Sequence, residues 1–227
     1  MSAAAVVILL DVDNTLLDND RVHEDLDDFL GHEFGAATRE RYWALIETLR
    51  TELGYVDYLG ALQRYRCEEA GAGRFDPGLS SIASFLLDYP FAERVYPGAL
   101  DALAYLRTRG PTVILSDGDI VFQPRKVQRA GLWQAVAGRV LIYVHKEQVL
   151  DDIERRYPAR HYVMVDDKLS ILSALKKILG GRVTTVFPRQ GHYALDPHNL
   201  STYPRADIEL ERIGDLINCS FHTQETT

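Results

Sequence analysis

Two pairs of carboxylates could act together in this sequence, and each pair directly follows a short apolar run. Asp11 and Asp13 follow the first such run, and Asp166 and Asp167 follow a later one. Turn formation is the alternative explanation of the first pair, and helix capping explains one member of the second pair but hardly both. Two like charges about 4 Å apart repel each other by on the order of 4 kcal/mol at an effective dielectric near 20. If the pairs meet, they require a divalent cation or strongly raised pKa values.

A hydroxyl and a lysine follow two other apolar runs. Ser116, Asp117 and Gly118 follow one of them, where the free N–H groups of a helix start could bind an anion. Capping of the next helix is the alternative for these residues. Lys146 follows the other run and could reach a phosphate or a carboxylate, although a lysine there is usually solvated. Lys126 competes for this role but lies further from its strand, so we favour Lys146.

The apolar runs that position these residues indicate a parallel sheet. Runs rich in branched side chains occupy residues 5–10, 112–115, 140–144, 162–165 and 183–187. Polar residues and then a helical period follow each of the first four, which is the rhythm of βαβ units with right-handed crossovers. We therefore predict an α/β fold with a three-layer, Rossmann-like parallel-sheet core. The polar groups are expected at its carboxyl edge, where such sheets bind ligands.

One long interval interrupts the βαβ rhythm. Between Val22 and Tyr96 there is no strand-like run, but residues 39–53 and 55–70 have apolar side chains at helical spacing. We therefore divide the chain into a core domain, residues 1–19 and 93–227, and an all-helical cap, residues 20–92. The polar tail, residues 223–227, is predicted to be disordered.

Composition excludes several classes of protein. The 227 residues are 46% hydrophobic and 26% charged, which is ordinary for a soluble globular protein. A net charge of -8 argues against a nucleic-acid partner. The apolar runs are too short to span a membrane, and Cys67 and Cys219 lack the spacing of a metal site or a disulfide framework. We expect a cytoplasmic protein with no nucleic-acid or membrane partner.

Taken in chain order, the four polar groups that follow the apolar runs resemble the motifs of the haloacid dehalogenase-like (HAD) hydrolases. These motifs are an aspartate pair, a Ser or Thr, a Lys and an acidic pair. Residues 95–100 look like the segment that returns from a cap in this family, and residues 206–216 look like its closing segment. A helical cap between the first two motifs is one of the family's cap types. The resemblance implies a HAD core with such a cap.

The resemblance also implies roles for the acidic residues. Asp11 is expected to be the nucleophile that forms an aspartyl phosphate, and Asp13 the general acid and base. Asp11, Asp13 through its carbonyl, and Asp167 are expected to bind a metal, with Asp166 binding directly or through water. Because all these ligands are hard oxygens, without a matching Cys or His, Mg²⁺ is the expected cofactor and zinc is not.

The remaining motif residues are expected to hold the phosphoryl group. Ser116 and the backbone N–H groups of Asp117 and Gly118 would bind its oxygens, and Lys146 would offset charge on it and on the nucleophile. Thr15 is expected to orient the first loop and to help bind the substrate.

The function that these residues favour is that of a Mg²⁺-dependent phosphatase acting on a small phosphorylated metabolite, as a monomer or homodimer. Another HAD reaction, phosphomutase or dehalogenase, and a non-catalytic phospho-ligand binding module are the alternatives. Dehalogenases of the family lack the second aspartate, so Asp13 argues against that reaction. His192 is more simply explained as a surface residue than as a site residue. Some aromatic and charged residues of the cap are candidates for contacting the leaving group, although most of the aromatic ones fit the cap core better: Tyr42, Trp43, Tyr55, Tyr58, Arg64 and Arg66.

Overall fold

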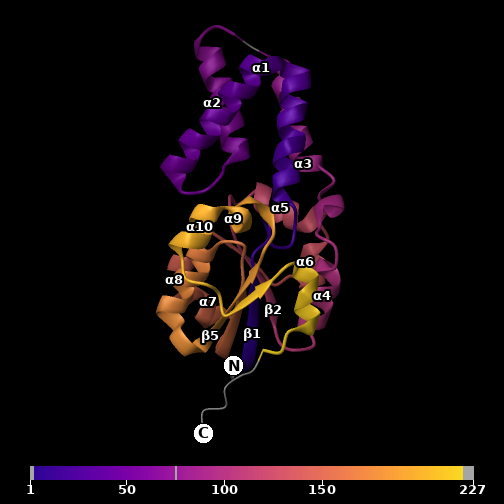
Figure 1. The fold of residues 1–227 in the computed structure, drawn as a ribbon. Coiled ribbons are helices and arrows are strands. Elements are labelled where there is room, and N and C mark those ends of the chain that lie inside the picture. Colours follow the sequence, from indigo (N-terminus) through magenta and orange to yellow (C-terminus); the bar gives the residue numbers. More distant parts are fainter. Residues whose placement is uncertain (1–2, 75, 222–227) are drawn as a thin grey trace.

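A parallel sheet of six strands forms the centre of the computed structural model, which describes residues 3–74 and 76–221 (Figure 1). The strand order is β3-β2-β1-β4-β5-β6. The predicted α/β class with a parallel sheet is confirmed, whereas the tail at 223–227 lies outside the described residues. The strands are β1 (Ala4–Leu10), β2 (Thr112–Asp117), β3 (Val140–Tyr143), β4 (Ala159–Val165), β5 (Val183–Pro188) and β6 (Ile208–Leu210).

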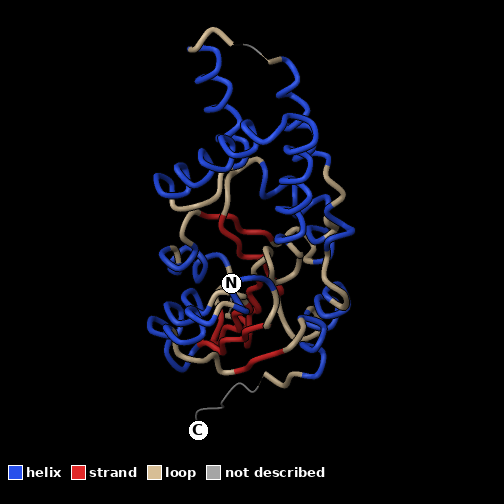
Figure 2. Tube along the Cα trace, turned by 45° about the horizontal axis from the view of Figure 1, so that its top comes forward, coloured by secondary structure: helices blue, strands red, loops and turns tan. Residues whose placement is uncertain are grey.

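Helices cover both faces of this sheet, as the tube view also shows (Figure 2). Helices α4, α5 and α6 contribute to the core on one face, and α7 and α8 to the core on the other. The α-helices are α1 (Asn19–Leu53), α2 (Tyr58–Gly71), α3 (Ser80–Asp88), α4 (Ala99–Leu106), α5 (Phe122–Arg129), α6 (Leu132–Ala135), α7 (Leu150–Arg156), α8 (Leu169–Leu179), α9 (Gly191–Leu195) and α10 (Pro197–Thr202). Short 3-10 helices are η1 (Pro77–Leu79), η2 (Phe91–Arg94), η3 (Lys146–Gln148), η4 (Gly180–Arg182) and η5 (Ile213–Asn218).

Strand β1 lies in the middle of the sheet and is buried on both faces. Its side chains alternate, so that Ile8 and Leu10 pack into one core, and Val7 and Leu9 pack into the other. Full burial of each such side chain stabilises the fold by about 1.5–3 kcal/mol. The register pairs Leu10 of β1 with Val165 of β4, so the two strands end at the same level. The residues that follow them are therefore brought side by side.

The sixth strand, β6, was not among the predicted runs. It has only three residues, Ile208–Leu210, and pairs with β5 at the edge of the sheet. Glu209 in its middle forms ion pairs with Arg189 and Arg205. A short edge strand that carries a charge has neither the length nor the apolar content of the buried strands, which is why apolar runs do not reveal it.

Between Asn19 and Asp88 the described residues form helices and connecting loops, without a strand, and they stand above the carboxyl edge of the sheet (Figure 1). We call this part of the chain the helical unit. Gly35 breaks α1 into two helical arms, because its backbone (φ 80°, ψ 171°) is not helical. The two segments that connect this helical unit to the core run antiparallel. Asp18 N donates to Arg94 O at 2.8 Å, and Tyr96 N donates to Leu16 O at 2.9 Å. The cap boundaries at residues 20 and 92 remain a prediction, and these paired segments lie close to both.

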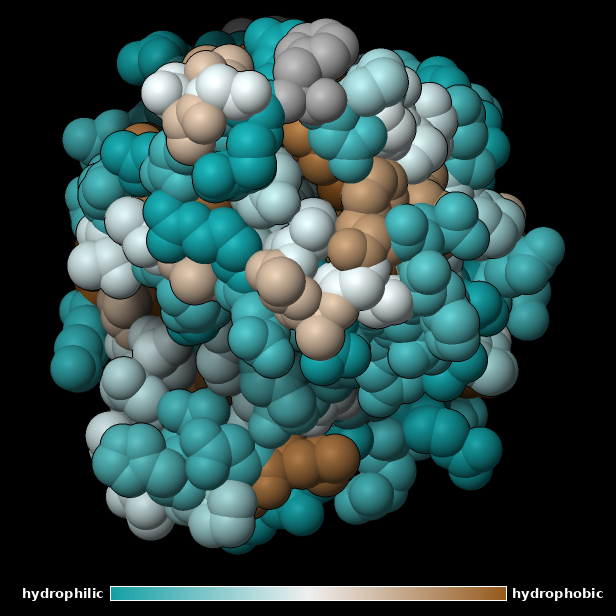
Figure 3. Space-filling view, turned by 90° about the horizontal axis from the view of Figure 1, so that it is seen from above, coloured by the Kyte–Doolittle hydropathy of each residue, from teal (hydrophilic) through white to brown (hydrophobic). Residues whose placement is uncertain are grey.

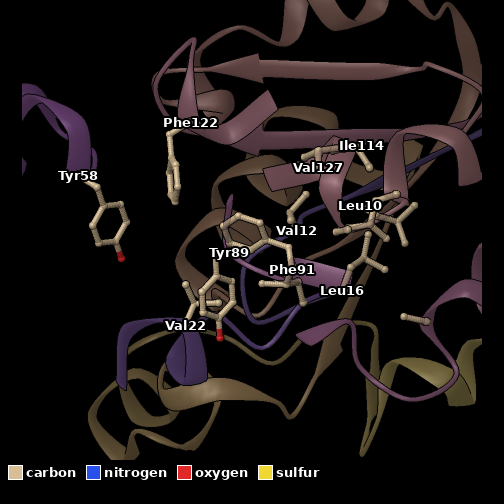
Figure 4. Close-up of a cluster of buried hydrophobic side chains, with 14 of the residues drawn as sticks. Leu10, Val12, Leu16, Val22, Tyr58, Tyr89, Phe91, Ile114, Phe122 and Val127 are labelled. Carbon is tan, nitrogen blue, oxygen red and sulfur yellow. The ribbon is translucent and has the colours of Figure 1, made fainter. Parts of the chain in front are cut away.

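Aromatic packing joins the helical unit to the core. Tyr58 of α2 faces Phe122 of α5, with ring centroids 5.3 Å apart, and Phe91 also contacts Phe122 at 5.9 Å (Figure 4). Tyr58 is almost fully buried, and burial is the main cause that raises its phenol pKa. This contact places α2 over the start of α5, next to the carboxyl edge of the sheet.

The end of the molecule formed by the helical unit is mainly hydrophilic. Apolar side chains on this face lie in small separate groups among charged and polar ones (Figure 3). Among the described residues, no helix combines the length and the hydrophobicity that crossing a bilayer would require.

Gly98 is expected to be a position where any side chain destabilises the core. It is the N-cap residue that precedes α4, at φ 79°, and a Cβ there would lie 3.0 Å from the Cα of Gly214 in η5. Gly131 has nearly the same backbone, φ 76°, but a Cβ there meets no atom within 4 Å. Both Gly→Ala variants incur left-handed strain of about 1–2 kcal/mol, and Gly98→Ala adds about 1–3 kcal/mol of overpacking. Urea unfolding should show this difference, and equal losses would contradict it.

Candidate active site

Three buried carboxylates meet at the carboxyl ends of β1 and β4. Asp11 follows β1, and Asp166 and Asp167 follow β4, so the shared register of these strands brings them together. One oxygen from each lies within 4.8 Å of the others. All three side chains are buried. The two acidic motifs, which are about 150 residues apart in the chain, thus form one cluster.

One ammonium group lies within this cluster. Lys146 Nζ is 2.5 Å from Asp11 Oδ1 and 2.7 Å from Asp166 Oδ2. Only the contact with Asp11 has the angles of a hydrogen bond, so Asp166 Oδ2 is ion-paired without accepting one. Both carboxylate oxygens of Asp167 are buried, and neither accepts a hydrogen bond from the part of the chain that the structure describes. Buried charges without partners are costly, so Asp167 lacks a cationic partner that its position demands.

The pKa values reflect this excess of negative charge. Burial raises the pKa of Asp11 to about 6, against the opposing effect of Lys146. Burial, together with Asp166 and Asp11, raises the pKa of Asp167 well above its ordinary value. Burial would lower the pKa of Lys146, but the nearby carboxylates outweigh it and raise that pKa. A divalent cation would relieve the repulsion, and a cluster of buried carboxylate oxygens fits Mg²⁺.

The loop after β1 is tied to the loop after β4. Thr15 is fully buried, and its hydroxyl accepts a hydrogen bond from Asp167 N at 3.0 Å. Asn14 has a left-handed backbone, φ 58°, which asparagine tolerates. Its side-chain oxygen accepts from Asn19 N at 2.9 Å and from Asp20 N at 3.2 Å, at the start of α1. These contacts favour an orienting role for Thr15 over direct binding of the substrate.

The predicted phosphate-holding residues lie at the end of β2. Ser116 is buried, and Asp117 Oδ1 accepts from Lys146 N at 2.7 Å. Burial is the main cause that raises the pKa of Asp117. Gly118 N donates to Tyr143 O at 3.0 Å, so this N–H is already engaged rather than free as expected. Ser116 therefore stands closest to the expected role.

Two residues of α5 reach Asp13. Lys126 Nζ is 2.7 Å from Asp13 Oδ1, so Lys126 reaches the crevice although it lies further from its strand than Lys146 does. Gln123 Nε2 donates to Asp13 Oδ2 and to Ser116 Oγ, both at 3.0 Å. Gln123 was not among the residues predicted to form the site. The signal that could have revealed Gln123 is its spacing of three residues from Lys126, which puts the two side chains on one face of the helix.

A cavity of about 620 Å³ lies between this site and the helical unit. Of the cap residues considered as candidates, Trp43, Tyr55 and Tyr58 line it. Tyr42 is instead fully buried in the core, and Arg64 pairs with Glu52. Arg50 and Asn19, which were not predicted, also line the cavity. The residues that line it include Asp13, Asn19, Trp43, Arg50, Tyr55, Tyr58, Lys126, Asp167, Lys168 and His192.

Helix α9 contacts both arms of α1 at the edge of this cavity. His192 Nδ1 lies 2.5 Å from Asp20 Oδ1, and Arg50 donates to the Tyr193 hydroxyl at 3.2 Å. The ammonium of Lys168 lies 4.7 Å from the centre of the Tyr193 ring. Lys168 is half-buried, in contrast to the solvated helix start that its sequence position suggests. His192 remains largely exposed at the cavity rim.

Removing one carboxylate from the cluster is expected to stabilise the metal-free protein. Asp167→Asn deletes a buried like charge, so its thermal midpoint in EDTA should exceed that of the wild type. Mg²⁺ should stabilise the wild type by about 2.7 kcal/mol at a hundredfold excess over Kd and leave Asp167→Asn unchanged. Thermal unfolding with EDTA and with Mg²⁺ tests both statements. Asp151→Asn, at an exposed position of α7, is the matched control, and a variant that still gains stability from Mg²⁺ would contradict the assignment.

Asp20 is expected to stabilise the fold in a pH-dependent way. Burial alone would raise its pKa, but hydrogen bonds from His192 and Asn14 outweigh it and lower the pKa below 3.8. A lowered pKa stabilises the folded state above the ordinary pKa and loses this effect as the pH falls through the folded-state value. Asp20→Asn should therefore lose about 1 kcal/mol near pH 7, and the difference from the wild type should shrink as the pH falls below 3.8. Urea unfolding across this range measures it, with Asp28→Asn on the same helix as the exposed control.

Comparison with known proteins identifies relatives of this chain. The family model of the haloacid dehalogenase-like hydrolases matches residues 6–178. A haloacid dehalogenase-like hydrolase of Burkholderia xenovorans LB400 has a similar crystal structure, with 63% identity, 95% of this chain and 96% of that chain covered, and a TM-score of 0.89. No curated protein matches the chain.

More distant structures share the fold alone. The HAD hydrolase YfnB of Bacillus subtilis, bound to magnesium, is 15% identical over 95% of this chain and 98% of that chain, with a TM-score of 0.61. L-2-haloacid dehalogenase of Xanthobacter autotrophicus is 19% identical over 93% of this chain and 96% of that chain, with a TM-score of 0.56. The family model matches most of the chain and one relative is 63% identical to it, and these two findings establish its family. The chain belongs to the haloacid dehalogenase-like hydrolases, a family of enzymes.

Proposed function

We propose that this hydrolase is a Mg²⁺-dependent phosphatase that cleaves a small phosphate monoester. The observation that carries the proposal is the cluster of Asp11, Asp166 and Asp167 around Lys146, with carboxylate oxygens within 4.8 Å of one another. Such an excess of buried negative charge suits a divalent cation and, with it, a doubly charged phosphate. The cavity of about 620 Å³ above the cluster has room for a small metabolite.

In the first step, Asp11 acts as the nucleophile. One of its oxygens bonds to phosphorus while the bond from phosphorus to the leaving-group oxygen breaks, and Asp13 gives that oxygen a proton. Lys146 and Ser116 stabilise the phosphoryl oxygens. Asp11, Asp166 and Asp167, with the carbonyl oxygen of Asp13, would hold Mg²⁺, which neutralises phosphoryl charge when it is bound.

In the second step, water releases the phosphate. Asp13, now a carboxylate, takes a proton from the water that attacks phosphorus, and the bond from phosphorus to the Asp11 oxygen breaks. Inorganic phosphate leaves and Asp11 is restored. The exposure of the Asp13 side chain, 29%, is compatible with access to both the alcohol and water.

The fold alone does not choose between phosphatase and dehalogenase, since an L-2-haloacid dehalogenase shares it with a relative described only as a haloacid dehalogenase-like hydrolase. A halide leaves as a stable anion and needs no proton, whereas an alkoxide does. Asp13 beside the cavity therefore supports an ester substrate. The structure of YfnB contains bound magnesium, which supports Mg²⁺ as the ion of this site.

The free thiols of Cys67 and Cys219 are compatible with the proposed cytoplasmic location.

The test compares two substrates. Purified protein is expected to release phosphate from p-nitrophenyl phosphate with Mg²⁺, to stop on chelation, and to release no chloride from 2-chloropropionate. Asp11→Asn should lower the turnover by at least about 10³-fold while its circular dichroism spectrum stays unchanged, and Asp151→Asn should keep full activity. Chloride release without phosphate release, or full turnover by Asp11→Asn, would overturn the proposal.

A further inference from the structure

The carboxylate of Asp13 is held at both of its oxygens by side chains of α5. Lys126 Nζ lies 2.7 Å from Oδ1, and Gln123 Nε2 lies 3.0 Å from Oδ2. Two donors on two different oxygens fix the rotation of a carboxylate plane, which a single contact leaves free. Each oxygen keeps a second lone pair, so both remain able to exchange a proton with another group.

The two donors are themselves buried and held in place. Lys126 is 2% exposed and Gln123 is 3% exposed, although Asp13 itself reaches the cavity. Asn19 Oδ1 also accepts from Lys126 Nζ, at 2.9 Å. A buried ammonium is costly unless it is paired, so the position of Lys126 depends on Asp13. Asp11 has a different lysine, Lys146, at 2.5 Å.

The backbone of the loop before α5 makes this arrangement possible. Gln123 and Lys126 are three residues apart and project from one face of the helix. A Cβ at Gly118 would lie 2.8 Å from the Cβ of Gln123, so only glycine lets Gln123 come so close. From there Gln123 Nε2 also donates to Ser116 Oγ at 3.0 Å. One side chain thus links the proposed acid to the proposed phosphate-binding hydroxyl.

We propose that Lys126 and Gln123 are positioning residues that orient Asp13 for proton transfer to the leaving-group oxygen. The inference rests on the proposed phosphatase function. As the bond between phosphorus and the ester oxygen breaks, that oxygen takes a proton from Asp13, and the geometry of Asp13 sets the efficiency of this transfer. Alkoxides are strong bases and need the proton, whereas p-nitrophenolate is a weak base and leaves without it.

The test is the dependence on the leaving group. The wild type and Lys126→Met are compared on p-nitrophenyl phosphate and on the best alkyl phosphate from a panel. Lys126→Met should lower kcat for the alkyl ester about 10- to 100-fold more than for the aryl ester, within the range that general acid catalysis contributes. Gln123→Met should shift the ratio of the two rates in the same direction. If Lys126→Met does not fold, Gln123→Met takes its place in the test.

Three controls separate positioning from a structural role. Lys177→Met removes an exposed lysine of α8 and should leave the ratio of the two rates unchanged. Lys126→Arg keeps a cationic donor, so its ratio of alkyl-ester to aryl-ester rates should lie close to that of the wild type. In an Asp13→Asn background, Lys126→Met should add no further change to the ratio, because the group that it positions is already absent.

The outcomes distinguish this inference from the proposed function. If the wild type cleaves neither ester, the phosphatase proposal fails. If the wild type cleaves both and Asp13→Asn selectively slows the alkyl ester, the function stands. In that case, equal losses for the two esters in Lys126→Met and Gln123→Met would overturn the positioning role. An added effect of Lys126→Met in the Asp13→Asn background would overturn it as well.

Discussion

An excess of buried negative charge is the constraint on which the site depends. Asp11, Asp166 and Asp167 are all buried, and one ammonium, that of Lys146, lies among them. Such a cluster opposes folding unless a cation or protons compensate it. The sheet supplies the large buried apolar surface that tolerates this cost, because β1 packs against a core on each face. The buried apolar surface of the sheet thus supports a charge cluster that a divalent cation would stabilise further.

The loop after β1 connects this charge cluster to the helical unit. Thr15 binds the backbone of Asp167, while Asn14, one residue earlier, accepts hydrogen bonds from the first residues of α1. A displacement of α1 therefore acts on the same short loop that carries Asp11 and Asp13. Helix α9 adds a second connection, because His192 holds Asp20 in the first turn of α1. The position of the helical unit and the geometry of the loop that carries Asp11 and Asp13 are therefore linked by direct contacts.

Much of this architecture could be predicted because it follows from periodic burial. Central strands such as β1 and β4 are continuous apolar runs, and parallel strands place their following residues at one edge. Hence Asp11, Asp166 and Asp167 were expected at one edge of the sheet, whereas the strand order that places β1 beside β4 was not predicted. The edge strand β6 was missed, because three residues around Glu209 carry no such pattern. The engagement of the Gly118 N–H by Tyr143 O was also missed, since it depends on the pairing of β2 with β3 beyond the end of the apolar run.

The two lysines of the site, Lys126 and Lys146, could not be assigned correctly from the sequence. Distance along the chain favoured Lys146, which follows its strand closely, and treated the two as rivals for one role. In the structure both are buried and each serves a different aspartate: Lys146 lies beside Asp11, and Lys126 beside Asp13. Lys126 lies nine residues after β2 and about one turn into α5, yet the helix returns its side chain to the edge of the sheet, so distance along the chain from a strand does not measure distance from a site. The two candidate lysines are therefore not alternatives for one position, because each forms an ion pair with its own aspartate.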